Sequence, residues 1–364
     1  MTDERMRAVI LTGHGGLEKL EYREDWPVPV PGPREVLIKV HACGMNNTDV
    51  NTRTGWYSKG TIEATTGAAL EGVQDDDATW GSAPLTFPRI QGADVAGTVV
   101  AGGAESDPNL IGKRVMIDTW LRDWSDPMNL NKTGYYGSEC DGGYAEYTIV
   151  DERNVHAIDS RLCHIEIASF ATSYITAENM LNRANVASGD RVLITGASGG
   201  VGSALIQLAK RRGAETVAVV SAAKEKLLEP VAPDFVIYRE ADNLAAALKD
   251  QTGDDKVSVV ADVVGGASFP DLIAALERGG RYTCAGAIAG PIVELDLRTF
   301  YLRDLTFTGA TIVPPGTFAD LVGYIERGEI KPIVAATYPL PKIREAQQAF
   351  IDKAHVGNIV IDLE

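Results

Sequence analysis

The sequence predicts an α/β protein in which a doubly wound parallel sheet is joined to a second, β-rich domain. Residues 191–220 contain a strand, a glycine-rich loop, a helix and a second strand in that order. The length of 364 residues exceeds what one hydrophobic core usually serves, so two domains are expected. Residues 6–33 hold short apolar runs broken by turn residues and prolines, which is typical of β-rich domains with irregular edges.

The first elements follow this β pattern. The alternating run from Val36 to Val40 predicts a strand. Short polar residues at 42–49 follow it, and a turn is expected at 55–57. Residues 151–158 predict the strand that leaves the first domain.

The central stretch carries the clearest pattern. Arg191 to Thr195 is a short apolar run that predicts a buried parallel strand, and the apolar residues from Val201 onward follow helical spacing. Gly213 stands where a helix end favours a left-handed residue, and Thr216 to Val220 predicts the next strand. The result is a βαβ unit.

Glycines between this strand and helix indicate a dinucleotide site. They remove side chains where the backbone must turn and approach a pyrophosphate, and the helix start supplies N–H groups. The alternative is a tight strand-to-helix turn without a ligand, which the complete βαβ context disfavours. The residues expected to hold the phosphates are Gly196, Ser198, Gly199, Gly200, Val201 and Gly202.

Residues after the second strand bear on the choice between NADPH and NADH. An NAD site usually has an acid about 20 residues past the glycine loop, but here Ser221 follows the strand and is not an acid. Lys224 and Lys226 follow, and they suit a 2′-phosphate better than a bare hydroxyl. NADPH is therefore predicted over NADH, although ordinary solvated lysines would look the same.

The later elements continue the pattern, and the carboxyl ends of their strands are where such a sheet binds its ligand. Val264 is therefore expected beside the cofactor, and the loop 286–290, with Gly286 and Ala287, is suited to bonding a carboxamide through its backbone. The predicted strands are 235–238, 257–264, 281–285 and 305–309, and the predicted helices are 165–181, 316–327 and 343–353.

Charge and composition exclude several classes of function. A formal net charge of -16 argues against nucleic-acid and anionic-membrane partners. No apolar span is long enough for a bilayer, and residues 1–5 do not resemble a secretory signal, so a cytoplasmic protein is expected. The four cysteines are widely separated, which disfavours both a structural zinc knot and a disulfide framework.

Several motifs together resemble the medium-chain dehydrogenase/reductase family. They are Glu35 to Gly44, Asn46 to Tyr57, Pro88 to Gly97, Gly142 to Tyr147, the glycine loop and Gly357 to Ile361. The resemblance implies a GroES-like catalytic domain at 1–155, completed by 313–364, and a Rossmann dinucleotide-binding domain at 156–312. It also implies an active site in a cleft, a small-molecule substrate, and a homodimer or homotetramer.

The resemblance further implies that no metal is bound. Where zinc enzymes of the family have a cysteine and a histidine, this chain has Asn46 and Ala93, and the third ligand position falls at about Thr172. None of these offers the sulfur or imidazole that zinc prefers. The lobe that carries four cysteines in zinc enzymes corresponds to 120–139, which lacks them.

What remains resembles the quinone oxidoreductase and enoyl reductase branch. There, residues matching Asn46 and Tyr57 lie beside the nicotinamide and in the substrate cleft, and Thr48 is expected to assist them. Hydride addition to an α,β-unsaturated carbonyl builds an enolate, which needs a hydrogen-bond donor and a proton that Tyr57 can supply. The alternative is that Tyr57 is a packed loop aromatic. Thr176 and Tyr238 match family residues that contact the cofactor.

Two long segments depart from compact reductases. Residues 58–85 and 119–143 are expected to be extra loops on the catalytic domain. The aromatic residues of 119–143 would line a substrate pocket, pack a subunit interface or cover the β-domain core.

The sequence thus predicts an NADPH-dependent, zinc-free oxidoreductase that reduces quinones or α,β-unsaturated carbonyl compounds. Two alternatives stay open: an alcohol or carbonyl dehydrogenase with an atypical metal site, and a non-catalytic NADPH-binding structural or sensing protein.

Overall fold

The computed structural model describes residues 4–68, 70–71, 73 and 84–364. The chain forms two compact units. The first comprises residues up to Thr61, Thr66–Thr172 and Pro314–Glu364, and the second comprises Ile62–Thr65 and Ser173–Val313. The strand at Val155–Ala157, next to the expected boundary at 155, pairs within the sheet of the first unit.

The first unit is β-rich. Its strands are β1 (Arg5–Leu11), β2 (Leu20–Pro27), β3 (Glu35–Met45), β4 (Asp94–Gly102), β5 (Arg114–Ile117), β6 (Trp120–Arg122), β7 (Thr133–Tyr135), β8 (Tyr147–Asp151), β9 (Val155–Ala157), β16 (Val334–Pro339) and β17 (Asn358–Asp362). Seven of them form one sheet in the order β16-β17-β3-β4-β5-β9, with β8 also paired to β3. β1 pairs with β2, and β6 with β7.

Strand β3 is the centre of this unit because it pairs with β17, β4 and β8. Val36, Ile38 and Val40 alternate inward as predicted, but the strand continues to Met45. Gly44 lets this part of the strand pack closely against Ala168, since a side chain there would overlap the carbonyl oxygen of Ala168. The extension delivers the chain directly to the helix that follows.

The helices of the first unit are α1 (Asn47–Thr54), α2 (His164–Ile167), α8 (Thr317–Glu326) and α9 (Ile343–Ile351). The last two match the helices predicted near the C-terminus. Helix α1 ends at Gly55, whose φ of 75° is a left-handed conformation that favours glycine.

The second unit contains a six-stranded parallel sheet in the order β12-β11-β10-β13-β14-β15. Its strands are β10 (Arg191–Ile194), β11 (Glu215–Val220), β12 (Phe235–Tyr238), β13 (Val257–Asp262), β14 (Leu276–Cys284) and β15 (Thr306–Gly309). This order reverses between β10 and β13, which is the switch point of a doubly wound sheet. The predicted fold class is confirmed.

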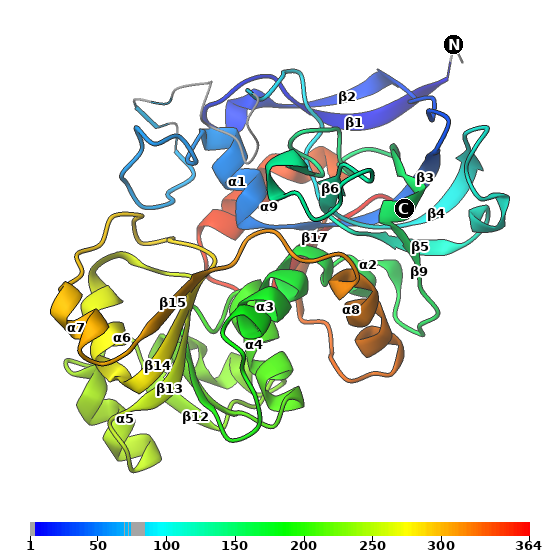
Figure 1. The fold of residues 1–364 in the computed structure, drawn as a ribbon. Helices are drawn as coiled ribbons and strands as arrows, with labels where there is room; N and C mark the ends of the chain where they lie inside the picture. The colour runs from blue at the N-terminus through cyan, green and yellow to red at the C-terminus, as the bar shows by residue number, and fades with distance from the viewer. Residues whose placement is uncertain (1–3, 69, 72, 74–83) are drawn as a thin grey trace. The chain divides into compact units, whose positions relative to one another are not determined.

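Helices cover both faces of this parallel sheet. They are α3 (Ala171–Arg183), α4 (Gly200–Arg211), α5 (Leu244–Thr252), α6 (Phe269–Ala275) and α7 (Leu297–Tyr301). Figure 1 shows α5 and α6 together on one side of the sheet and α3 and α4 on the other. The core combines strand residues such as Leu193 and Val260 with helix residues such as Leu272.

The single helix predicted over 165–181 was wrong, because two helices, α2 and α3, occupy this stretch. Ser169 explains the break. Its hydroxyl donates to the carbonyl of Glu166 at 2.7 Å and its amide does the same at 3.2 Å, which tightens the chain into a turn.

The two long segments differ in structure. In 58–85 no helix or strand occurs among the residues that are described, and the acidic run 75–77 lies outside them. Segment 119–143 is not a plain loop, since it contains the β6–β7 hairpin. Its residues Trp120, Tyr135 and Tyr136 are buried, so these aromatics help to cover the β-domain core. Over the described part of the chain, every helix is too short or too polar to cross a lipid bilayer.

Candidate active site

The glycine loop joins β10 to α4 with the geometry that phosphate binding needs. Gly196 has a left-handed φ of 57°, and Gly199 is the N-cap residue of α4. Gly200, Val201 and Gly202 form the first turn of the helix, whose N–H groups have no partner within the helix itself. Any side chain at Gly202 would overlap the backbone of Gly196, so the turn depends on its absence.

A buried carboxylate, Asp262, ties together the strand ends at the switch point. It accepts hydrogen bonds from the hydroxyl of Thr195 at 2.5 Å and from the hydroxyl of Tyr282 at 2.7 Å. It also accepts from the backbone amides of Val264 at 2.8 Å and Gly265 at 3.1 Å. The sequence analysis did not predict a role for Asp262. The one indication in the sequence is that this acid stands at the end of an apolar run.

A cavity of about 230 Å³ opens at the carboxyl ends of the strands in the second unit. Six of the residues predicted to bind the cofactor line it: Gly196, Ser198, Ser221, Lys224, Tyr238 and Val264. They come from the ends of β10, β11, β12 and β13 and from the segments that follow. This is the place where a doubly wound sheet binds a dinucleotide.

One edge of this cavity is basic. Lys224 donates to the hydroxyl of Ser198 at 3.5 Å. The pKa of Lys224 is lowered, mainly by burial and also by the positive charge of Arg239. Arg239 pairs with Glu240 at 2.9 Å, and Tyr238 donates to Glu225 at 2.7 Å. Sequence reasoning missed Arg239, although a cation directly after a predicted strand was a usable signal.

The other predicted cofactor residues lie elsewhere in the same unit. Lys226 is exposed and does not line the cavity. Gly286 and Ala287 begin the loop after β14, and this loop docks on the end of β13 through the amide of Ala289, which donates to the carbonyl of Val264 at 2.8 Å. Thr176 is a half-buried residue of α3.

In the first unit, Asn46 is buried directly before α1. Its backbone amide donates to the carboxylate of Asp49 at 2.8 Å. The same carboxylate accepts from the amide of Gly92 at 3.2 Å and from the hydroxyl of Tyr144 at 3.0 Å. Burial raises the pKa of Asp49 to about 7 despite these donors. Asp49 thus fixes the start of α1.

A second buried carboxylate, Asp94, lies in the same region. The amide of Thr172 donates to it at 2.9 Å, and the Thr172 hydroxyl donates to the same oxygen. The hydroxyl of Tyr135 forms a hydrogen bond with that of Thr172 at 2.6 Å. Burial raises the pKa of Asp94 to about 6, while Thr172 and the side chain of Asn46 oppose the rise.

These residues do not fit a zinc ion. Zinc prefers cysteine sulfur and histidine nitrogen in a tetrahedral set. The three positions that the resemblance assigns to zinc ligands hold an amide at Asn46, a methyl group at Ala93 and, at about the third position, the hydroxyl of Thr172, which already binds Asp94. None of these three side chains is one of the imidazole or thiolate ligands that zinc prefers.

Thr48 and Tyr57 lie on and just after α1. Thr48 is half-buried and interacts with the hydroxyl of Tyr135. Tyr57 is also half-buried, and the side-chain amide of Asn51 donates to its oxygen at 3.5 Å. Burial raises the pKa of Tyr57, so its hydroxyl keeps its proton at neutral pH. The three predicted catalytic residues therefore belong to one short segment of the first unit.

We expect Asp94→Asn to remove a pH dependence of stability. Native Asp94 holds its proton up to about pH 6, above its ordinary value of 3.8. Because the pKa of Asp94 is higher in the folded than in the unfolded protein, its protonated form adds to the free energy of unfolding. This contribution is complete below pH 3.8 and is lost as the pH rises through 6. Asparagine keeps an acceptor for Thr172 and removes the buried charge.

Chemical unfolding of both proteins at acid and at alkaline pH measures this effect. Between about pH 4 and about pH 8 the variant should gain up to roughly 3 kcal/mol relative to the parent. An equal difference at both pH values would show that Asp94 does not titrate in this way.

Comparison with known proteins places this fold and site in a family. The alcohol dehydrogenase GroES-like domain matches residues 32–160, and the zinc-binding dehydrogenase domain matches residues 200–327. The chain is 45% identical to a candidate alcohol dehydrogenase from Sinorhizobium meliloti 1021, whose solved structure superposes with a TM-score of 0.90 and covers 100% of this chain and 98% of that one.

Two relatives of named activity extend over nearly the same length. Human quinone oxidoreductase is 28% identical over 355 residues, which is 95% of this chain and 94% of that protein. Acryloyl-coenzyme A reductase from Sulfurisphaera tokodaii is 25% identical over 367 residues, covering 98% and 99%. The chain belongs to the medium-chain dehydrogenase/reductase superfamily, in its quinone oxidoreductase-like branch. These relatives and the Sinorhizobium structure identify the chain as an NAD(P)H-dependent oxidoreductase.

Proposed function

We propose that this protein uses NADPH, without zinc, to reduce a quinone or an α,β-unsaturated carbonyl compound. The observation that carries the proposal is the cavity at the strand ends of the second unit, with the glycine loop at one side and Lys224 at another. Such a cavity suits the adenosine half of a dinucleotide. The reduced cofactor supplies a hydride when bound.

The residues of the second unit have separate tasks toward NADPH. The first-turn amides of α4, at Gly200 to Gly202, would hold the pyrophosphate. Lys224 and Arg239 would bind the 2′-phosphate, with Arg239 leaving its exposed partner Glu240. Ser221 follows β11 and lacks the carboxylate that would repel this phosphate.

The residues of the first unit suit a carbonyl substrate. Reduction at the β-carbon moves negative charge to the carbonyl oxygen, and a proton must then reach the α-carbon. Tyr57 holds its proton at neutral pH, so it would donate a hydrogen bond to this oxygen or give up the proton. Asn46 and Thr48 would orient the substrate from the same segment.

The names of the relatives support this substrate class. Human quinone oxidoreductase and acryloyl-coenzyme A reductase are named for a quinone and for acryloyl-coenzyme A, and the acryloyl group is an α,β-unsaturated carbonyl. An alcohol dehydrogenase is the second candidate, because the Sinorhizobium structure carries that name. Asn46, Ala93 and Thr172 are neither cysteine nor histidine, which favours the first candidate over a zinc-dependent one.

A substrate panel tests the proposal. Purified protein is mixed with NADPH and with quinones, enones or enoyl thioesters, and loss of the reduced cofactor's absorbance is followed. Turnover of one of these classes is expected, with Tyr57→Phe retaining NADPH affinity but losing rate. NADPH binding without turnover of any acceptor would instead indicate a structural or sensing protein.

A further inference from the structure

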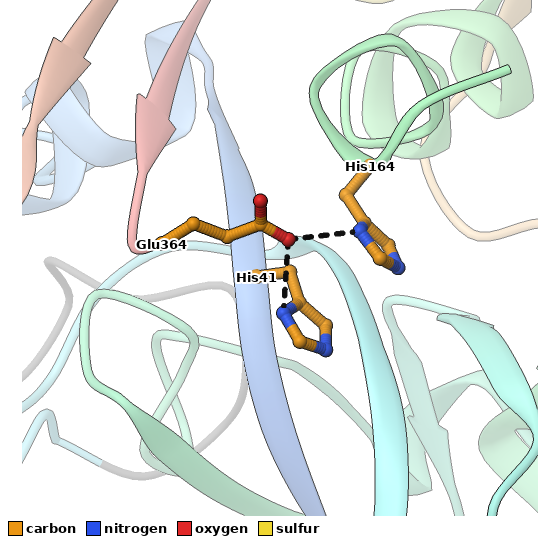
Figure 2. A group of neighbouring side chains, drawn as sticks. All are labelled: His41, His164 and Glu364. Atoms are coloured by element: carbon orange, nitrogen blue, oxygen red, sulfur yellow. Dashed lines mark ion pairs between the residues drawn. The ribbon is translucent and has the colours of Figure 1, made fainter.

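Two histidines and a glutamate gather on the surface of the first unit. Figure 2 shows His41, His164 and Glu364 side by side, with one carboxylate oxygen of Glu364 facing both rings. The Nδ1 atom of each histidine lies 3.2 Å from this oxygen. One ligand atom from each residue lies within 4.8 Å of the other two. This group shares no residue with the site around Asn46 and Asp94.

The orientation of His41 leaves its Nδ1 atom available to a ligand. On the other side of the ring, Nε2 forms a hydrogen bond with the hydroxyl of Thr98 at 3.1 Å. When Nε2 carries the proton and donates to Thr98, Nδ1 has a lone pair directed at the cluster. A hydrogen bond of this kind behind a histidine is the usual support of a metal ligand.

The two imidazole rings are stacked, with centroids 4.2 Å apart and planes 17° from parallel. Two imidazolium rings in this arrangement would repel each other. The arrangement therefore presents nitrogen lone pairs better than it presents two positive charges.

The backbone holds all three residues in place. His41 is in β3. Its carbonyl accepts a hydrogen bond at 3.0 Å from the amide of Leu363, the residue directly before Glu364. Glu364 donates its own amide to the carboxylate of Asp362 at 3.0 Å. His164 begins α2, where the amide of Cys163 donates to Glu166 at 2.8 Å. The three side chains start from ordered backbone, so little reorganisation is needed to bind an ion.

We propose that His41, His164 and Glu364 bind one divalent transition-metal ion, such as zinc. Two imidazole nitrogens and one carboxylate oxygen are ligands that zinc accepts, and water would complete a tetrahedral set at this exposed position. The ion would join β3, α2 and the end of the chain after β17, and would stabilise the folded first unit. This metal has no part in the hydride transfer proposed above.

Zinc titration of the full-length, chelator-treated protein tests the proposal. Calorimetry of the parent should give one zinc ion per chain, and zinc should raise its melting temperature. His41→Gln, His164→Gln and Glu364→Gln should each abolish this uptake. Thr98→Val should weaken it about 10-fold, because it removes only the support behind His41. His355→Gln replaces a histidine outside the cluster and should bind zinc like the parent.

Glu364→Gln is the variant expected to keep the fold, because the Glu364 side chain is 61% exposed and can be changed without disturbing the core. The proposal is overturned if the parent takes up no zinc, or if Glu364→Gln and His164→Gln bind zinc as the parent does. It is also overturned if Asp94→Asn, but not His41→Gln, removes the uptake, because the ion would then occupy the other site.

Discussion

We expect Gly202→Ala to lower the affinity for NADPH by up to about 100-fold. One methyl group added to a closely packed site costs about 1–3 kcal/mol. A methyl carbon there would lie 2.6 Å from the Cα atom of Ala197 and would overlap the carbonyl oxygen of Gly196. The glycine loop must then move away from the start of α4, and the N–H groups of the first turn no longer point together at the pyrophosphate.

Fluorescence titration with NADPH measures this effect, and thermal unfolding separates it from loss of the fold. The matched control is Gly309→Ala, because an added methyl carbon at Gly309, at the end of β15, meets no atom within 4 Å. The control should bind NADPH with the affinity of the parent. Equal affinity of the parent and Gly202→Ala would contradict the role given to this loop.

Lys224→Ala and Arg239→Ala are each expected to raise the KM for NADPH about 10-fold, since a charge-assisted hydrogen bond contributes about 1.5–3 kcal/mol. The double variant should lose about 100-fold if the two contributions add. The KM for NADH should change little, because NADH has no 2′-phosphate. Steady-state kinetics with both cofactors measure the shift in preference.

Lys226→Ala is the control for this pair, because Lys226 is exposed and does not line the cavity. It should behave like the parent with both cofactors. A loss of the same size for NADH and NADPH in the double variant would mean that the two cations support the fold rather than the 2′-phosphate. A parent that prefers NADH would also count against this assignment.

Local sequence patterns predicted the second unit well. The strand from Arg191, the helix start near Gly200 and the strand 235–238 were predictable because parallel strands are apolar runs and glycines mark close backbone approaches. The helix over 165–181 failed because one side-chain hydrogen bond, from Ser169, outweighed a regular apolar pattern.

The polar contacts of the candidate site could not be predicted in this way. Asp262 gathers donors from residues as distant in sequence as Thr195 and Tyr282, and only the folded sheet brings them together. Likewise, Asp94 meets Thr172 through a contact that spans 78 residues. A single acid in an apolar run gives no sign of which donors will surround it.

The central claim is that hydride transfer in this protein needs no metal, and turnover by metal-stripped protein tests it most directly. The parent is treated with a strong chelator, its zinc content is measured, and NADPH oxidation is followed with an accepted quinone or enone. Full turnover at a zinc content near zero is the predicted result. Loss of turnover that returns when zinc is added, in His41→Gln as well as in the parent, would contradict the account.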